Sequence, residues 1–191
     1  KPEYFSENER GIGSKHEKLS PTMSTLIISA HTKDGLEYCR HYHLPEVLVR
    51  VCLEHHGTSL IEYFYHQAQD QSPPGEKVRE ELFRYPGPKP QTRESAVVFL
   101  ADSVEAASRT LGEPTPKRLQ NLIHEIVMKR LLDHQLDECG LTLCELEKIE
   151  ESFSRMLTGI FHARVSYPTG ATAEQGLKKM GLADPHQREE G

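Results

Sequence analysis

The chain has 191 residues, of which 36% are hydrophobic and 27% charged, and its formal net charge is −6. This composition predicts one globular domain with its own core, and no apolar run approaches the roughly 20 residues that a membrane span needs. The negative charge argues against a generic nucleic-acid binder, although a metal site could still attract a small phosphate ligand. Four cysteines without a CxxC pair indicate free thiols in a reducing compartment.

Helix signals follow one another from the start of the chain. Ser20 followed by Pro21 predicts the first helix, because serine is a good N-cap and proline suits the first helical position. Pro45 predicts the start of a second helix, which Gly57 is well placed to end. An aromatic-rich segment indicates a third helix over residues 58–69.

The second half of the chain continues this pattern after an irregular stretch. Residues 69–81 are polar and are expected to form an exposed excursion, and three prolines exclude a regular helix from residues 83–90. Thr92, Thr115 and Thr142 are each placed to cap a further apolar helix, the last one through a capping box with Glu145 three residues later.

The resulting fold class is all-α, because convincing strand alternation is absent. We expect residues 1–167 to form one helical domain. The polar, glycine-containing residues 168–191 are expected to be a disordered tail.

Three features carry side chains suited to metal chemistry. His31 is expected at the end of the first helix, and His55 and His56 end the second helix. Asp102 lies within the most apolar helix, where a carboxylate on the buried stripe is costly unless it is paired or binds a metal. Imidazole and carboxylate ligands together suit iron, manganese or zinc.

Each feature also has an ordinary interpretation. A histidine at a helix end is commonly a cap or a surface residue, and an aspartate in an apolar helix can pair with an arginine. Adjacent histidines on a helix point about 100° apart. The pair therefore favours two neighbouring metals, or one metal and a substrate, over a single cation held by both rings. Two close metals suit in-line displacement at phosphorus.

Longer stretches resemble one known family. They include HTKDG at residues 31–35, HHGT at 55–58, FRYPGPKP at 83–90 and LADSVEAA at 100–107. Their order resembles the HD superfamily of metal-dependent phosphohydrolases, and specifically the seven-transmembrane HD (PgpH-type) phosphodiesterases of cyclic di-AMP. The resemblance extends over nearly all of residues 1–168, and the last two stretches are its most specific part.

The resemblance implies an HD-domain helical bundle with two divalent metal ions, iron or manganese. Such a site hydrolyses one phosphodiester of cyclic di-AMP to give the linear dinucleotide. His31, His55, His56 and Asp102 fall on the metal-ligand positions of the family. The resemblance also implies that the parent protein carries this soluble portion on the cytoplasmic face of the cell membrane.

The sequence departs from the family in one respect, because it contains no His-Asp dipeptide. In the family this dipeptide and another histidine precede the Pro-x-Tyr-Phe stretch, which is residues 2–5 here. We therefore expect three ligands to lie upstream of Lys1, and we expect the chain alone to bind metal poorly and to be inactive. The alternative is a catalytically incomplete module that senses a cyclic dinucleotide.

Four residues are candidates for substrate contacts. Arg84 and Lys89 of the proline-rich segment are expected to contact phosphate, and Tyr85 lies between them, while Tyr65 is placed to stack on a base. An ion pair is an equal alternative for Arg84, as core packing is for the tyrosine. Glu54, beside the histidine pair, is expected to be solvated, and a role in supporting the metal ligands is the alternative. The near-heptad apolar stripe of the last helix favours core packing or pairing in a homodimer.

Overall fold

The computed structural model describes residues 15–112 and 114–163, so the predicted tail over residues 168–191 lies outside the described residues. Within these ranges the chain is helical and contains no strand, which confirms the all-α class. None of the helices described there combines the length and apolarity that a membrane crossing demands. The elements are η2 (Lys15–Lys18), α1 (Pro21–His41), α2 (Glu46–Glu54), α3 (Glu62–Gln71), η3 (Glu80–Phe83), α4 (Arg93–Ser108), α5 (Pro116–Leu132) and α6 (Leu143–Ala163).

The predicted helix starts are confirmed by their caps. At each start a side-chain hydroxyl accepts a hydrogen bond from the backbone N–H three residues later, and these hydroxyls belong to Ser20, Thr92, Thr115 and Thr142. The last of these caps is a reciprocal box, because the Glu145 carboxylate accepts from the Thr142 backbone N–H at 2.9 Å. Local chemistry therefore fixes where these four helices begin.

Helix α1 is longer than expected and runs to His41, so His31 lies in the middle of the helix rather than at its end. Gly35 does not end the helix. It lies where α1 faces α2, and a Cβ at this position would be 3.7 Å from the Cys52 sulfur. Tertiary packing against α2 and α3 here outweighs the weak helix propensity of glycine.

Helix α3 begins later than expected, at Glu62 rather than at residue 58. The preceding residues pair instead with the segment after η3, where Leu60 and Arg84 form an isolated antiparallel bridge. The Ile61 N–H donates to the Phe83 carbonyl at 2.8 Å, and the Tyr85 N–H donates to the Ser59 carbonyl at 3.0 Å. This pairing holds the proline-rich segment beside the end of α2.

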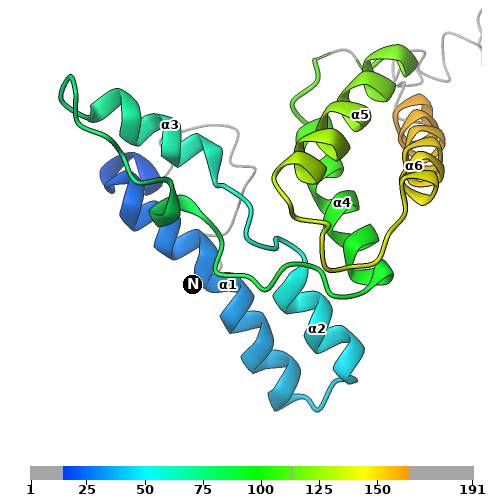
Figure 1. Cartoon of the computed structure of the whole chain (residues 1–191), viewed down its shortest axis with the longest axis horizontal. Helices are drawn as coiled ribbons and strands as arrows, with labels where there is room; N and C mark the ends of the chain where they lie inside the picture. The colour runs from blue at the N-terminus through cyan, green and yellow to red at the C-terminus, as the bar shows by residue number, and fades with distance from the viewer. Residues whose placement is uncertain (1–14, 113, 164–191) are drawn as a thin grey trace, which may run out of the picture.

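The helices form two halves that meet between α2 and α4 (Figure 1). In the first half α1 packs against α2 and α3, and in the second half α5 packs against α4 and α6. The largest buried cluster belongs to the second half and consists of Ala96, Phe99, Leu100, Val104, Leu119, Ile123, Val127, Leu136, Cys139, Leu146 and Leu157. Helix α4, which carries Asp102, is thereby held on a packed framework.

Candidate metal centre

Three histidines, one from α1 and two that follow α2, converge where α1 passes the end of α2. His31, His55 and His56 are half-buried, and each offers one ring nitrogen such that the three atoms lie within 4.8 Å of one another. The Nε2 atoms of His31 and His55 are 3.1 Å apart. Residues 24 positions apart in the sequence thus form a cluster of the size that a metal ion requires.

Backbone carbonyls orient two of these rings. The Nδ1–H of His31 donates to the Ile28 carbonyl at 2.6 Å, and the Nδ1–H of His55 donates to the Cys52 carbonyl at 2.9 Å. A carbonyl can only accept, so each neutral ring keeps its lone pair on Nε2. A carbonyl partner on the distal nitrogen is the usual arrangement of a metal-binding histidine.

The two Nε2 atoms fit a bound cation. Lone pairs that face each other at 3.1 Å repel unless a proton or a metal ion lies between them. The donor set of imidazoles with a nearby carboxylate suits a divalent transition metal. The residues present therefore fit the metal that the sequence predicts.

His56 completes the cluster and connects it to α4. Its Nδ1 lies 3.3 Å from an Asp102 carboxylate oxygen, which brings the fourth predicted ligand to the edge of the cluster. Burial lowers the pKa of His56 to about 3, and electrostatic interactions with His55, His31 and Arg130 add to the shift. Its imidazole is consequently neutral at physiological pH, which is the form that binds metal.

Two expectations about this site were wrong in detail. Asp102 is not on the buried stripe of α4, which Ala96, Phe99, Leu100 and Val104 form, because its side chain is 42% exposed. The rings of His55 and His56 do not diverge, since α2 ends at Glu54 and the pair lies at and beyond its C-cap. Their centroids are 4.1 Å apart. Helical geometry therefore does not apply to this pair.

Tyr85 borders the histidine cluster. Its ring stacks on His56 with centroids 4.3 Å apart and an interplanar angle of 21°, and it meets His31 edge-on at 6.1 Å. Tyr65 instead packs against the buried Phe83, with centroids 5.8 Å apart. Of the two tyrosines that the sequence selects, the structure brings Tyr85 to the cluster, and it shows core packing for Tyr65.

Arg84 forms the ion pair that the sequence left as an alternative. Its guanidinium donates to both oxygens of Asp133 at 2.7 and 3.1 Å, to Glu80 at 2.6 and 2.9 Å, and to the Thr58 carbonyl at 2.8 Å. Hydrogen bonds from Arg84 to Asp133 raise the pKa of the guanidinium, burial opposes this, and Glu80 adds to it. All five N–H donors of Arg84 are thus engaged within the fold.

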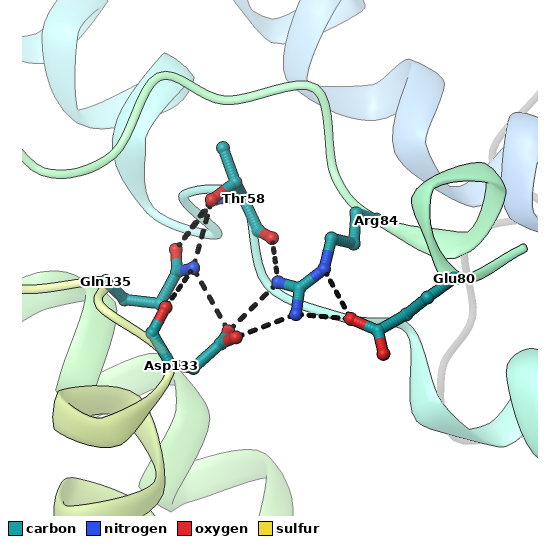
Figure 2. A network of polar contacts seen from close by, with 5 residues as sticks. All are labelled: Thr58, Glu80, Arg84, Asp133 and Gln135. Carbon is teal, nitrogen blue, oxygen red and sulfur yellow. Dashed lines mark hydrogen bonds and ion pairs between the residues drawn. The ribbon is translucent and has the colours of Figure 1, made fainter.

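Gln135 extends this network to the turn after the histidine pair (Figure 2). Its buried amide accepts from the Thr58 N–H at 2.8 Å and donates to the Thr58 hydroxyl at 2.9 Å and to Asp133 at 3.0 Å. Gly57 is in the left-handed region with φ of 54°. A Cβ at Gly57 would lie 2.5 Å from the Gln135 side-chain oxygen. The turn that positions His55 and His56 is therefore held by residues far along the chain.

Sequence reasoning missed three residues around the cluster. Glu54 is buried rather than solvated, because its carboxylate accepts from the Gln91 N–H at 2.9 Å. Gln135 and Arg130 carried no functional signal. Arg130 in particular resembles any basic residue in the last turn of a helix. Only their three-dimensional neighbours distinguish them.

Comparisons with known proteins find relatives of this chain. No family model matches the chain. Over 168 residues it is 46% identical to the cyclic-di-AMP phosphodiesterase PgpH of Bacillus subtilis and 42% identical to that of Listeria monocytogenes. These alignments cover 88% of this chain and 23% of each relative, so the chain spans about a quarter of the length of these relatives.

Solved structures give the same family. The crystal structure of the L. monocytogenes PgpH HD domain superposes with a TM-score of 0.77 at 41% identity, over 85% of this chain and 74% of that domain. The same domain in complex with cyclic di-AMP matches with a TM-score of 0.77, over 84% of this chain and 73% of that domain. This chain therefore belongs to the family of PgpH HD domains.

Proposed function

We propose that this chain is the metal-dependent phosphodiesterase domain of a protein that hydrolyses cyclic di-AMP to the linear dinucleotide. The observation that carries the proposal is the convergence of His31, His55 and His56 within 4.8 Å, with Asp102 beside them. The proposal is supported by relatives that are cyclic-di-AMP phosphodiesterases and by the solved domain that binds cyclic di-AMP.

His31, His55, His56 and Asp102 would hold two divalent ions, which we propose to be iron or manganese. Ions held by these residues would supply Lewis acidity that activates water and would offset the charge of the phosphate. The chain itself orients the His31 and His55 rings through the Ile28 and Cys52 carbonyls. Three additional ligands of the family, the His-Asp dipeptide among them, are proposed to come from residues ahead of Lys1 in the parent protein.

Substrate contacts are proposed for residues at the border of the cluster. We propose that Tyr85 contacts an adenine, because its ring lies within the site, where one of its faces packs on His56. Lys89 lies four residues further along the same segment and is half-buried, and we propose that it contacts phosphate. Arg84 supports this segment through its ion pairs instead. We also propose that the domain works at the cytoplasmic face of the cell membrane.

A second candidate is a cyclic-dinucleotide sensor without catalysis, which the lack of a His-Asp dipeptide favours. Turnover of cyclic di-AMP separates the two functions. The protein at its full encoded length is incubated with Mn(II) or with EDTA, and the products are separated by chromatography. The phosphodiesterase gives linear dinucleotide with Mn(II) only, and His55→Ala abolishes the product. Binding without any product in the metallated protein would favour the sensor.

A further inference from the structure

Arg130 is a half-buried arginine that the site described above does not use. It lies in the last turn of α5. Its Nε–H donates to the Ser103 hydroxyl at 3.3 Å, and its guanidinium carbon lies 5.6 Å from the centroid of the Phe99 ring. These two contacts attach Arg130 to α4 at the residue that follows Asp102.

No carboxylate among residues 15–112 and 114–163 forms an ion pair with Arg130. The three acidic residues that act on its charge from a greater distance are Glu62, Asp133 and Asp102. Each of them contacts another side chain, which is Lys129 for Glu62, Arg84 for Asp133 and His56 for Asp102. Each of these three carboxylates near Arg130 therefore already has another side chain as its partner.

Arg130 and Arg84 differ in whether a carboxylate binds the guanidinium. Two carboxylates bind Arg84 directly and their hydrogen bonds raise its pKa, whereas burial is the largest influence on Arg130 and lowers its pKa. A desolvated guanidinium without a bound anion is costly for the fold. Such a group is typical of a site that recognises a carboxylate or phosphate ligand, which arginine can bind with two parallel hydrogen bonds.

The position of Arg130 indicates which ligand it serves. Its Nε–H bonds to Ser103, the neighbour of Asp102 in α4, and the Asp102 carboxylate lies 3.3 Å from His56, so the guanidinium is attached beside the histidine cluster. It also interacts electrostatically with Tyr85, the ring that stacks on His56. Contact with the helix dipole is a weaker explanation, because the Nε–H of Arg130 is directed to Ser103 of α4 rather than to a carbonyl of α5.

We propose that Arg130 is a substrate-binding residue whose guanidinium donates hydrogen bonds to the non-bridging oxygens of a phosphodiester held at the histidine cluster. This inference rests on the proposed function. Negative charge on these oxygens is spread over the phosphoryl group in the transition state, so a preorganised guanidinium stabilises it there. Arg130 thereby adds positive charge at the site without a carboxylate bound to it.

The test uses Arg130→Gln, Arg130→Lys and the control Arg155→Gln in the protein at its full encoded length. Arg155 is an exposed residue of α6, and its side chain is 72% exposed. Loss of a preorganised donor to a developing anion typically costs a factor of about 10²–10³, and we expect Arg130→Gln to lower kcat/KM by this amount. Arg130→Lys should lose less, because it keeps the charge but not the planar fork. Arg155→Gln should match the wild type.

Two further measurements separate substrate binding from a structural role. Arg130→Gln should keep the wild-type Mn(II) affinity and should not lower Tm, because it removes an unpaired charge. Equal kcat/KM in the variant and the wild type overturns the inference, as does a loss of activity that accompanies a lower Tm or weaker Mn(II) binding. If the wild type shows no turnover, the phosphodiesterase function fails. Calorimetric binding of cyclic di-AMP then decides the role of Arg130: weaker binding by Arg130→Gln supports it, while equal or undetectable binding overturns it.

Discussion

The pairing of His31 with His55 depends on two backbone hydrogen bonds that leave both Nε2 lone pairs directed at the same point. Because a carbonyl fixes each ring, the ligands are oriented before any metal arrives. This preorganisation reduces the entropic cost of binding. A carbonyl partner is therefore as much a part of this site as the imidazole that it orients.

Replacing His31 with alanine is expected to weaken Mn(II) binding by at least about tenfold, because it removes a ligand whose Nε2 faces that of His55. The free Mn(II) signal in electron paramagnetic resonance measures the affinity in the protein at its full encoded length. His124→Ala is the matched control, since His124 is largely exposed on α5 and contacts Glu150. Equal affinities in the two variants would contradict the metal centre.

Asp133 gives the fold a pH dependence. Burial raises the pKa of Asp133, but hydrogen bonds and charge from Arg84, with help from Gln135 and Arg130, hold it below the usual value. A carboxyl whose pKa is depressed on folding stabilises the folded state above its unfolded pKa of about 4, and this stabilisation is lost as the pH falls through the lower folded pKa.

Asp133→Asn is therefore expected to lower the free energy of unfolding by about 1–2 kcal/mol at pH 7, since it removes the charge that Arg84 binds. The difference between variant and wild type should shrink as the pH falls below about 4, because the unfolded carboxyl becomes protonated there and the folded one follows at its lower pKa. Urea unfolding at both pH values measures this difference. A gap that is the same at pH 7 and pH 3 would show that the Asp133 charge is unimportant.

Part of this site could be predicted from residue identity alone. The three histidines could be selected because imidazole is a metal ligand and because two of them are adjacent before Gly57. The role of Gln135 and the ion-pair partners of Arg84 could not be inferred, since they depend on Thr58 and Asp133, which are distant in sequence. Amino-acid type says little about such long-range partners.

At the scale of elements, the turn between α2 and α3 controls the site. It follows directly after the histidine pair, and the fold holds it from two sides through Arg84 and Gln135 (Figure 2). Gly57 lies within this turn, with a positive φ and a side of the backbone that faces Gln135. The turn therefore accepts no side chain at this position without movement.

Gly57→Ala is expected to lower the free energy of unfolding by about 2–3 kcal/mol, because alanine is strained at this φ and its Cβ collides with the buried Gln135. Gly159→Ala in α6 is the control, and the opposite change in stability is expected for it. A Cβ there meets nothing within 4 Å, and the helix should gain about 0.5–1 kcal/mol. Chemical denaturation compares the two variants, and a neutral Gly57→Ala would mean that the turn is not constrained.

Helix starts were predictable because the capping signal is local, as Ser20, Thr92, Thr115 and Thr142 show. The start of α3 was not, since residues 59–61 pair with residues 83–85 across an excursion of some twenty residues. Helix-like composition before Glu62 was overridden by this tertiary contact. The length of α1 beyond His31 has the same origin in packing.

At the scale of the whole molecule, the site lies where the two halves meet (Figure 1). His31, His55 and His56 belong to the first half, and Asp102 belongs to α4 of the second. A metal ion held by both groups would join the halves. No sequence pattern predicted the contact of α2 with α4, although the order of motifs correctly indicated that their residues share one site.

Mn(II) should consequently stabilise the protein at its full encoded length against heat. A ligand that binds only the folded state adds about 2.7 kcal/mol at a concentration one hundred times its Kd. Differential scanning fluorimetry should show a higher Tm with Mn(II), and EDTA should reverse the increase. His55→Ala should keep its own Tm with or without the ion. An equal Mn(II) effect on wild type and variant would place the bound ion elsewhere.

The most direct measurement is turnover of cyclic di-AMP by the protein at its full encoded length, with Mn(II) and with EDTA, in parallel with His55→Ala. The account predicts that the wild type releases the linear dinucleotide only when Mn(II) is present, and that the variant releases at least about a hundredfold less, because it lacks a ligand that the His31 ring faces. Product formation that is unaffected by EDTA or by the loss of His55, or no product from the metallated wild type, would contradict it.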